Sequence, residues 1–382
     1  MAETPIVVLG SGLAGYGVAR ELRKLDTGRP LVIVSRDDAR AYSKPMLSNA
    51  LASGKTPAQL GGASAQEMGA QLRAKVLANT EVRAIDAHRQ QVELDDETLH
   101  YSKLVLALGA DPISAAIAGD AAHEVQRVND LESYARFRVR IEGRRRVVLL
   151  GAGLIGCEFA NDLLQGGYAV NIVDSAPYPL GRLLPKPAAE RIEAALARLG
   201  ARWHLGTTAT TVSRSRGGLR VTLADGTILE ADAVLSAIGL QPRTDLARRA
   251  GLAVNRGIVT DRFLATSAPD VYALGDCAEV DGVVLPYVAP ILHAARSLAR
   301  TLTGTPTAVA YPAMPVVVKT PAIPTVVAPP AALEGAWITE ASESGVEARF
   351  VNGAGALTGF ALVGAATTRK GALVRLLPPV LA

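Results

Sequence analysis

Apolar runs and helical periodicity alternate near the start of the chain. Residues 6–9 and 31–34 are short apolar runs rich in β-branched residues. Between them, residues 13–24 carry Leu22 on an apolar side, as expected for an amphipathic helix. A glycine-rich turn, residues 10–15, separates the first run from this helix. The pattern predicts a β-turn-α-β unit at the start of the chain.

The same pattern returns in the middle of the chain. Residues 147–150 form a second apolar run, residues 151–156 a second glycine-rich turn, and residues 157–164 a helical stretch. A further strand is predicted at residues 170–173. The chain therefore contains an internal duplication of one unit, and this is its main organisational feature.

The remaining apolar runs predict further strands and one long helix. Before and after the second unit, we predict strands at 82–86, 91–94, 104–108, 233–238 and 271–274, a hairpin at 219–226, and a helix at 288–303. The last part of the chain alternates β-like runs, at 316–319, 348–351 and 358–363, with glycine and proline turns. We interpret it as a small separate domain.

Composition and charge narrow the classes of function. The chain is 49% apolar and 20% charged, which is ordinary for a globular protein. A net charge of +4 favours an acidic partner, but the excess is not concentrated as in a nucleic-acid binder. We interpret the densest basic patch as a solvated helix face leading into a strand; it comprises Arg136, Arg138, Arg140, Arg144, Arg145 and Arg146.

Cysteine usage and the absence of membrane signals favour the cytoplasm. Cys157 and Cys277 are the two cysteines and lie far apart, so a secreted disulfide framework is not expected. The first apolar run follows no basic region and is broken by glycines, unlike a signal peptide. Prolines and Lys319 interrupt the apolar stretch 313–333, so it does not predict a membrane span. We expect a cytoplasmic protein that does not associate with membranes.

The glycines of the first turn have separate physical tasks. Gly10 permits the tight turn, Gly12 lets the backbone approach a diphosphate, and Gly15 lets the helix pack close to the strand. The N-terminus of the helix offers free N–H groups and a partial positive charge to the diphosphate. One such motif can arise by chance, but two in the same context predict two bound nucleotides. A flavin with its own electron donor is the economical explanation.

The acidic residue after the second strand of each unit distinguishes the two predicted sites. Asp174 lies where a carboxylate can accept hydrogen bonds from a ribose 2′-OH and repel a 2′-phosphate, which favours NADH over NADPH. In the first unit Val34 is followed by Ser35, so no acid occupies the usual place. Asp37, slightly further along, is the candidate for the ribose contact there.

Five segments carry a resemblance that spans essentially the whole chain: residues 42–48, 104–110, 151–161, 236–242 and 271–276. Through them the chain resembles the FAD/NAD-linked reductases of the glutathione-reductase type and, among these, the NADH-dependent rubredoxin reductases. These segments are highly specific for the fold and for FAD plus NAD. They are less specific for the electron acceptor.

We therefore expect an α/β fold with two Rossmann-like dinucleotide-binding domains and a small α+β C-terminal domain. The FAD-binding domain is expected to be split between residues 1–113 and 244–312. The NADH-binding domain, residues 114–243, is inserted between these two parts. Residues 313–382 form the C-terminal domain, which closes the flavin site.

The resemblance implies roles for particular side chains. Lys44 and Pro45 would lie beside the flavin ring, with Lys44 paired to Glu158 near the reactive N5 atom. Glu158 would sit on the first turn of its helix, facing the route of the nicotinamide. Lys44 and Glu158 are thus the expected catalytic residues. The alternative for this pair is a surface ion pair that joins two domains.

Four further roles follow from the same resemblance. Asp276 would bind a ribityl hydroxyl, and the helix that starts at Val288 would direct its positive end at the flavin N1–C2=O region. Lys319 would add a cation there, unless it is an ordinary edge-strand lysine. Val82 would contact the adenine through its backbone. The full expected cofactor-binding set is Gly10, Ser11, Gly12, Leu13, Ala14, Gly15, Asp37, Lys44, Pro45, Val82, Gly151, Gly153, Leu154, Ile155, Gly156, Glu158, Asp174, Gly239, Asp276, Val288 and Lys319.

The placement of the cysteines bears on the electron acceptor. Disulfide reductases of this fold carry two closely spaced cysteines, and its peroxidases and oxidases carry one near the position of Ser43; neither pattern is present. We expect Cys157 and Cys277 to be buried small residues. Electrons would then leave from the flavin one at a time, to an acidic rubredoxin-type iron protein that the net positive charge attracts. No metal-ligand spacing occurs among the histidines.

Alternatives remain open at this point. An NADH oxidase using O2, or a reductase of ferredoxin or flavorubredoxin, would share the cofactors. A flavin-based redox sensor would share them without rapid turnover. The pathway, alkane degradation or oxygen detoxification, is not determined. The short C-terminal domain favours a monomer.

Overall fold

The first glycine-rich turn joins two strands of a parallel sheet. The computed structural model describes residues 3–330 and 334–382. In it the first sheet has the order β19-β7-β1-β2-β3, all parallel, with β1 (Ile6–Leu9), β2 (Leu31–Val34), β3 (Lys75–Leu77), β7 (Lys103–Leu106) and β19 (Val271–Ala273). The apolar runs form its centre because helices cover the sheet and bury its strands. These helices are α1 (Leu13–Leu25), α3 (Ala65–Leu72) and α8 (Val288–Leu302).

The first sheet also carries a small antiparallel sheet at its side. This sheet is formed by β4 (Val82–Asp86), β5 (Gln91–Leu94) and β6 (Thr98–His100). Helix α1 packs against α8, and a side-chain carbon on Gly17 would lie 3.6 Å from Ala295 Cβ. The predicted helix at 288–303 and the predicted strands at 82–86 and 91–94 are confirmed.

The second glycine-rich turn has an equivalent setting. The second sheet has the order β12-β11-β10-β16-β9, with β9 (Gln126–Arg127), β10 (Arg146–Leu150), β11 (Ala169–Asp174), β12 (Arg202–Leu205) and β16 (Ala233–Ser236). Its helices are α4 (Leu131–Ile141), α5 (Leu154–Gln165) and α6 (Lys186–Arg198). The predicted hairpin is confirmed within an antiparallel sheet of β13 (Ala209–Ser215), β14 (Gly218–Leu223) and β15 (Ile228–Ala231).

Two short strands connect the region of the first parallel sheet with that of the second. β8 (Ala110–Pro112) and β17 (Leu240–Pro242) pair antiparallel, so the chain passes out and back along one narrow ribbon. After β17 the chain returns through α7 (Asp245–Arg249) and β18 (Ile258–Thr260) to β19 of the first sheet, and β20 (Ala278–Val280) then pairs with β18. The expected ends of the NADH-binding domain, at residues 114 and 243, lie beside this ribbon. All the expected domain boundaries stay predictions.

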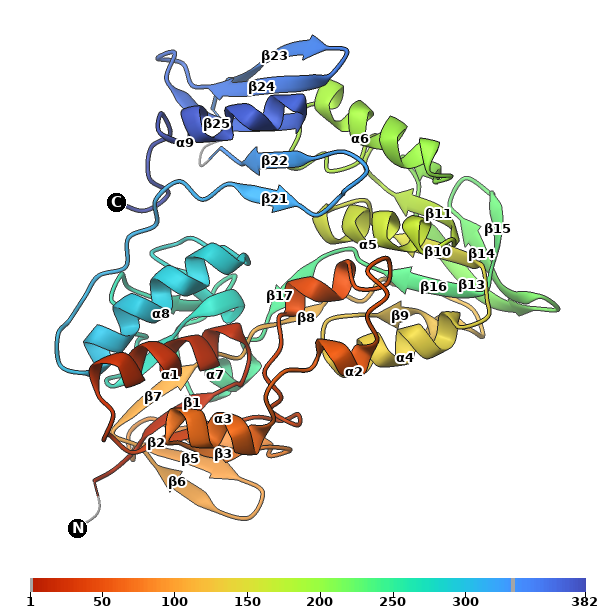
Figure 1. Ribbon diagram of the computed structural model, residues 1–382. Coiled ribbons are helices and arrows are strands. Elements are labelled where there is room, and N and C mark those ends of the chain that lie inside the picture. Colours follow the sequence, from red (N-terminus) through yellow and green to blue (C-terminus); the bar gives the residue numbers. More distant parts are fainter. Residues whose placement is uncertain (1–2, 331–333) are drawn as a thin grey trace.

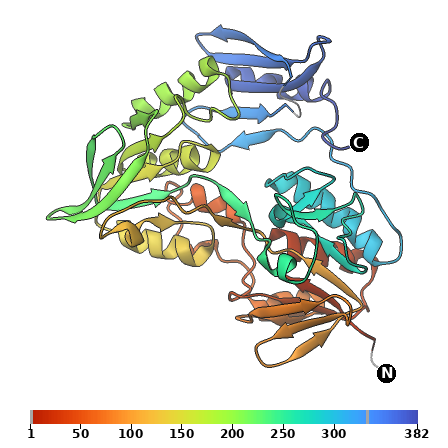
Figure 2. The ribbon, with the colours of Figure 1, turned by 180° about the vertical axis from the view of Figure 1, so that it is seen from behind.

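The C-terminal part forms a five-stranded antiparallel sheet. Its order is β21-β22-β25-β24-β23, with β21 (Val316–Val318), β22 (Thr325–Ala328), β23 (Ala336–Ser342), β24 (Gly345–Val351) and β25 (Leu357–Gly364), followed by α9 (Lys370–Val374). Helix α6 of the second sheet packs against β24 and β25. Figures 1 and 2 show this sheet at the end of the molecule opposite the N-terminus.

The predicted fold class is confirmed, with differences in detail. Helix α5 begins at Leu154 rather than near Cys157, so Glu158 lies in its second turn and not in the first. The apolar stretch 313–333 contains β21 and β22, and residues 331–333 lie outside the described part. Among residues 3–330 and 334–382, the helices are too short or too polar to cross a bilayer.

Candidate functional site

The first glycine-rich turn forms a cradle that its glycines make possible. Gly10 has φ +114°, and a side-chain carbon there would lie 2.2 Å from the Ala107 carbonyl oxygen. A side-chain carbon on Gly15 would lie 1.8 Å from Gly10 O, so close packing excludes larger residues at both positions. Gly12 differs, because a carbon there would meet nothing within 4 Å. It precedes α1 without a side-chain cap, so the first N–H groups of the helix have no partner within the helix or from a capping side chain.

The second turn repeats this geometry. Gly151 has φ +103°, and side-chain carbons on Gly151 and Gly156 would lie 2.5 Å from Ala237 O and 2.0 Å from Gly151 O. Gly153 again has open space beside it and again precedes its helix without a side-chain cap. Both helix N-termini therefore have the free N–H groups and the room that a diphosphate requires.

Each cradle has a carboxylate, held in a different way. In the second unit, Asp174 accepts hydrogen bonds from the backbone N–H groups of Ala152 and Ala176, at 2.5 and 2.7 Å. The carboxylate therefore lies against the glycine turn, at the carboxyl end of β11. This is the position from which it can accept bonds from a ribose.

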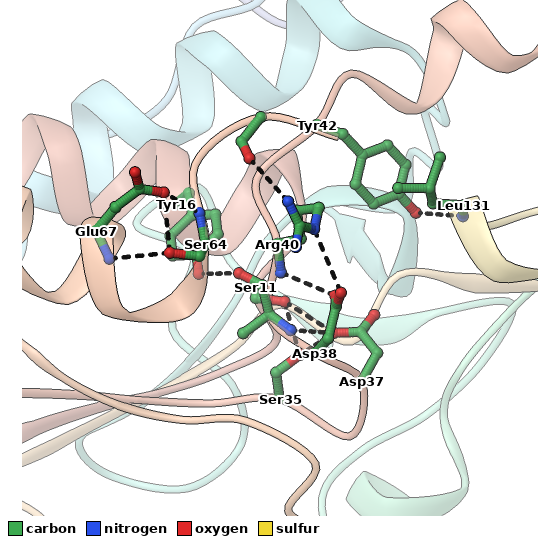
Figure 3. Close-up of polar contacts among 12 residues, drawn as sticks. Ser11, Tyr16, Ser35, Asp37, Asp38, Arg40, Tyr42, Ser64, Glu67 and Leu131 are labelled. Carbon is green, nitrogen blue, oxygen red and sulfur yellow. Dashed lines mark hydrogen bonds and ion pairs between the residues drawn. The ribbon is translucent and has the colours of Figure 1, made fainter. Parts of the chain in front are cut away.

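In the first unit the carboxylate is that of Asp37, which two serine hydroxyl groups bind (Figure 3). Asp37 Oδ1 accepts hydrogen bonds from Ser35 Oγ at 2.6 Å and from Ser11 Oγ at 3.3 Å. The two hydroxyl groups are also 2.6 Å apart. Asp37 thus lies at the first cradle although it comes later in sequence than the usual acid. Ser35 is a residue that sequence reasoning missed as a participant.

The Gly-Asp segment 275–276 packs on the first cradle. Gly275 has φ +80°, and a side-chain carbon there would lie 2.9 Å from Ala14 Cβ. Burial raises the pKa of Asp276, while Lys44 lowers it. Burial lowers the pKa of Lys44, while Asp276 raises it. The two buried groups therefore lie close enough to influence each other electrostatically, and within the described residues no protein hydrogen bond satisfies the Asp276 carboxylate.

The predicted ion pair between Lys44 and Glu158 is wrong. Glu158 Oε2 lies 2.6 Å from Lys319 Nζ, and Glu158 Oε1 accepts a hydrogen bond from the Lys319 backbone N–H at 3.0 Å. Lys44 Nζ instead contacts Asn129 Oδ1 at 3.5 Å. The reason is topological, because Lys319 follows β21 and meets α5 from the C-terminal sheet, taking the position assigned to Lys44. Lys319 is thus not an ordinary edge-strand lysine.

Glu158 and Lys319 also hold the segment that carries Pro45. Lys319 Nζ donates hydrogen bonds to Pro45 O and, at 2.8 Å, to Ser48 Oγ. Ser48 Oγ donates to Glu158 Oε2 at 2.6 Å. Glu158 is 1% exposed while Lys319 keeps 26% exposure, so this is an ion pair with one buried member. Sequence reasoning did not identify Ser48, although it lies in the segment 42–48 that carries the resemblance.

The remaining predicted residues lie at element ends near the cradles. Val288 begins α8, and Ile291, three residues later, lies 4.0 Å from a side-chain carbon placed on Gly275. Gly239 follows β16 with φ +126°. Val82 begins β4 and packs against the core of the first sheet. The adenine contact of Val82 and the dipole role of α8 stay predictions.

The cysteines and the basic patch behave as expected. Burial raises the pKa of Cys277 to about 11 and raises that of Cys157 well above its usual range. Both thiols are buried and free. In the basic patch, ion pairs join Arg136 to Glu132, Arg140 to Glu124 and Arg146 to Asp232.

Comparison with known proteins agrees with this geometry. The family description "Pyridine nucleotide-disulphide oxidoreductase" matches residues 4–307, and "Rubredoxin binding C-terminal domain" matches residues 308–377. The Rubredoxin-NAD(+) reductase of Alcanivorax borkumensis is 50% identical over 379 residues, covering 99% of each chain. The Nitric oxide reductase FlRd-NAD(+) reductase of Aeromonas hydrophila is 39% identical over 375 residues, covering 98% of this chain and 96% of its own.

A solved structure supports the same relation. Putidaredoxin reductase, in its covalent complex with putidaredoxin, superposes with a TM-score of 0.88 at 28% identity and covers 99% of this chain and 94% of its own. The family match spans both cradles, and the relatives match the chain over almost its full length. The expected resemblance is confirmed, and the chain belongs to the pyridine nucleotide-disulphide oxidoreductase family.

Proposed function

We propose that the protein is an NADH-dependent FAD reductase that passes electrons to a rubredoxin-type iron protein. The first cradle would hold the FAD diphosphate and the second the NADH diphosphate. When bound, the two cofactors supply a hydride donor and an acceptor that can release electrons singly. The task of the protein is then to place the two rings against each other and to exclude competing reactions.

One observation carries this proposal: both cradles are open, while both thiols are inaccessible. Gly12 and Gly153 each leave room for a diphosphate at an uncapped helix N-terminus. Cys157 and Cys277 are buried, and their raised pKa values keep them protonated near neutral pH. A thiol relay therefore has no reactive group, and electrons would pass directly from the flavin to an external acceptor.

The residues at the cradles would have defined tasks. Asp37 and Asp174 would accept hydrogen bonds from the two riboses, and the charge of Asp174 would disfavour a 2′-phosphate. The partly dehydrated Asp276 would accept a bond from a ribityl hydroxyl, with Lys44 near it. The Glu158–Lys319 pair would fix Pro45 beside the flavin, because Lys319 donates to the Pro45 carbonyl. Lys44 and Glu158 thus act from separate places.

The choice of acceptor rests on the C-terminal part. Residues 308–377 match a rubredoxin-binding description, and relatives similar over the whole chain are named as rubredoxin reductases. The net charge of +4 would assist the docking of an acidic partner. A flavorubredoxin is the second candidate, because a 39% identical relative is named for it. We also place the protein in the cytoplasm; its free cysteines support this location.

Steady-state turnover with a panel of acceptors tests the proposal. The purified protein is expected to show a flavin spectrum and to oxidise NADH faster with rubredoxin than with flavorubredoxin, ferredoxin or O2. NADPH is expected to be a poor donor. The highest kcat/KM with O2, or a colourless protein that FAD does not reconstitute, would contradict the proposal.

A further inference from the structure

Helix α5 carries three buried polar side chains on one face. Asn161 and Asp162 lie three and four residues after Glu158, so both lie one helical turn beyond it, to either side of its position on the helix. Their exposures are only 1%, 2% and 2%. Buried polar residues on a helix that belongs to a core need partners, and here the partners come from outside the second sheet.

Asp162 binds the segment that follows Pro45. Its two carboxylate oxygens accept hydrogen bonds from the backbone N–H groups of Leu51 and Ala52, at 3.0 and 2.8 Å. Close packing continues at the end of the helix, where a side-chain carbon on Gly166 would lie 2.8 Å from Leu51 Cδ2. Each carboxylate oxygen of Asp162 therefore holds one backbone N–H group of residues 51–52.

Asn161 binds the segment that carries Lys319. Its Oδ1 accepts a hydrogen bond from the Ala322 backbone N–H at 3.1 Å. One turn closer to the N-terminus, Glu158 binds Lys319 and Ser48. The face of α5 thus contacts residues 45–52 on one side and residues 319–322 on the other. Figure 1 shows α5 between the C-terminal sheet and the segment after β2.

The burial of Asp162 is unfavourable for a carboxylate. Burial raises its pKa, and the N–H groups of Ala52 and Leu51 counteract this shift. An apolar residue would avoid the cost of dehydration but would leave two backbone N–H groups without partners. The carboxylate is therefore suited to holding a backbone in place rather than to strengthening a core.

We propose that Asp162 and Asn161 are positioning residues for hydride transfer. They hold the backbone of residues 51–52 and of Ala322 on α5, close to the residues that carry Pro45 and Lys319, and the N-terminus of α5 forms the second cradle. The same helix therefore sets the position of Lys44, Pro45 and Lys319 relative to the nicotinamide. The inference rests on the proposed function, since it assigns these residues to the joint between the flavin and NADH sites.

Single substitutions on this face test the inference. Asp162→Asn keeps the shape of the side chain but leaves only one acceptor oxygen, and Asp162→Ala removes both oxygens. Asn161→Ala removes the hydrogen bond from Ala322. The control is Glu279→Gln, because Glu279 is another buried carboxylate that accepts backbone N–H bonds, from Arg256 and Gly257. Stopped-flow absorbance measures flavin reduction by NADH, and thermal unfolding is recorded for each variant.

A positioning role and a purely structural role give different results. We expect Asp162→Ala to slow flavin reduction by about tenfold to a hundredfold, with Asp162→Asn and Asn161→Ala intermediate. Flavin content should stay full, the KM for NADH should change less than kcat, and the flavin absorbance bands should shift. Glu279→Gln should lower Tm by a similar amount without slowing reduction.

The inference fails if all four variants slow flavin reduction only in proportion to their loss of folded protein. It also fails if Asp162→Ala changes the KM for NADH alone. Turnover of the unmodified protein with NADH and rubredoxin is measured first. If that turnover is absent, the proposed function is wrong; if it is present and Asp162→Ala matches Glu279→Gln, only the positioning role is wrong.

Discussion

The two β-turn-α-β units of the chain build the same cradle and use their helices differently. In both, a side-chain carbon on the first or third glycine would clash with a backbone oxygen. A carbon on the middle glycine would instead meet open space. Helix α1 then packs within its own region, with Gly17 close to Ala295 of α8. Helix α5 instead directs Glu158, Asn161 and Asp162 at two other parts of the chain.

The difference shows which features belong to nucleotide binding and which to assembly. Three glycines and an uncapped helix suffice for the cradle, because on the proposed function it is the backbone that would bind the diphosphate. The rest of each helix is free to serve another purpose. For α1 this is the core around the first sheet, and for α5 it is the joint with residues 45–52 and 319–322.

Closing each cradle separately gives the largest expected effects. Gly12→Val and Gly153→Val each add a side chain whose Cβ meets no described protein atom within 4 Å. We expect Gly12→Val to lose bound flavin and all turnover. Gly153→Val should keep its flavin and raise the KM for NADH by about a hundredfold or more, because the diphosphate can no longer reach the helix. Flavin absorbance and steady-state kinetics measure both effects, and far-UV circular dichroism controls for folding. Equal flavin loss in both variants would contradict the separate roles.

The carboxylates provide the next test of the comparison. Asp174→Ser removes a charge that would accept bonds from a ribose and repel a 2′-phosphate. Loss of a hydrogen bond to a charged group costs about 1.5–3 kcal/mol, so kcat/KM for NADH should fall by about tenfold to a hundredfold. The preference for NADH over NADPH should shrink with it. Asp37→Ser is the matched variant, and it should speed flavin dissociation while leaving the NADH/NADPH ratio unchanged. A changed ratio in Asp37→Ser would reverse the assignment of the two units.

The ion pair on α5 should affect stability as well as kinetics. Lys319→Met leaves the carboxylate of Glu158 buried without its cation, and Lys319 is itself 26% exposed. We expect the free energy of unfolding to fall by about 1–3 kcal/mol, less than for a fully buried pair. Urea denaturation measures this change. The double variant Lys319→Met with Glu158→Gln should recover part of the loss, and an additive loss would show that the pair is not coupled.

Removal of the thiols should have the smallest effect. Cys277 has a pKa of about 11 and that of Cys157 is also raised, so both remain thiols at pH 8. The doubly substituted Cys157→Ala, Cys277→Ala protein should therefore keep turnover within about twofold, and the native protein should resist alkylation. Because both folded-state pKa values are raised, the contribution of these groups to stability is complete below the unfolded-state pKa and declines as pH rises toward the folded values. Loss of turnover would point to a thiol relay.

The sequence predicted what local rules determine. The cradles follow from glycine spacing, and the confirmed strands from apolar runs, because both depend on neighbouring residues. The partner of Glu158 depends instead on where the C-terminal sheet lies, and so Lys44 was assigned in place of Lys319. The Ser11–Ser35–Asp37 arrangement was also hidden, because a serine at the usual acidic position gives no signal by itself.

The ribbon of β8 and β17 has a consequence for how the molecule can change. Leu240 pairs with Pro112 and Pro242 with Ala110, so the outgoing and returning segments run side by side in opposite directions. Everything between them, residues 113–239, is a loop with adjacent ends, and such an insert can be exchanged for another without rerouting the remaining chain. A different module can therefore be grafted between these two strands, provided that its first helix keeps the acceptors that Glu158, Asn161 and Asp162 offer to the rest of the chain.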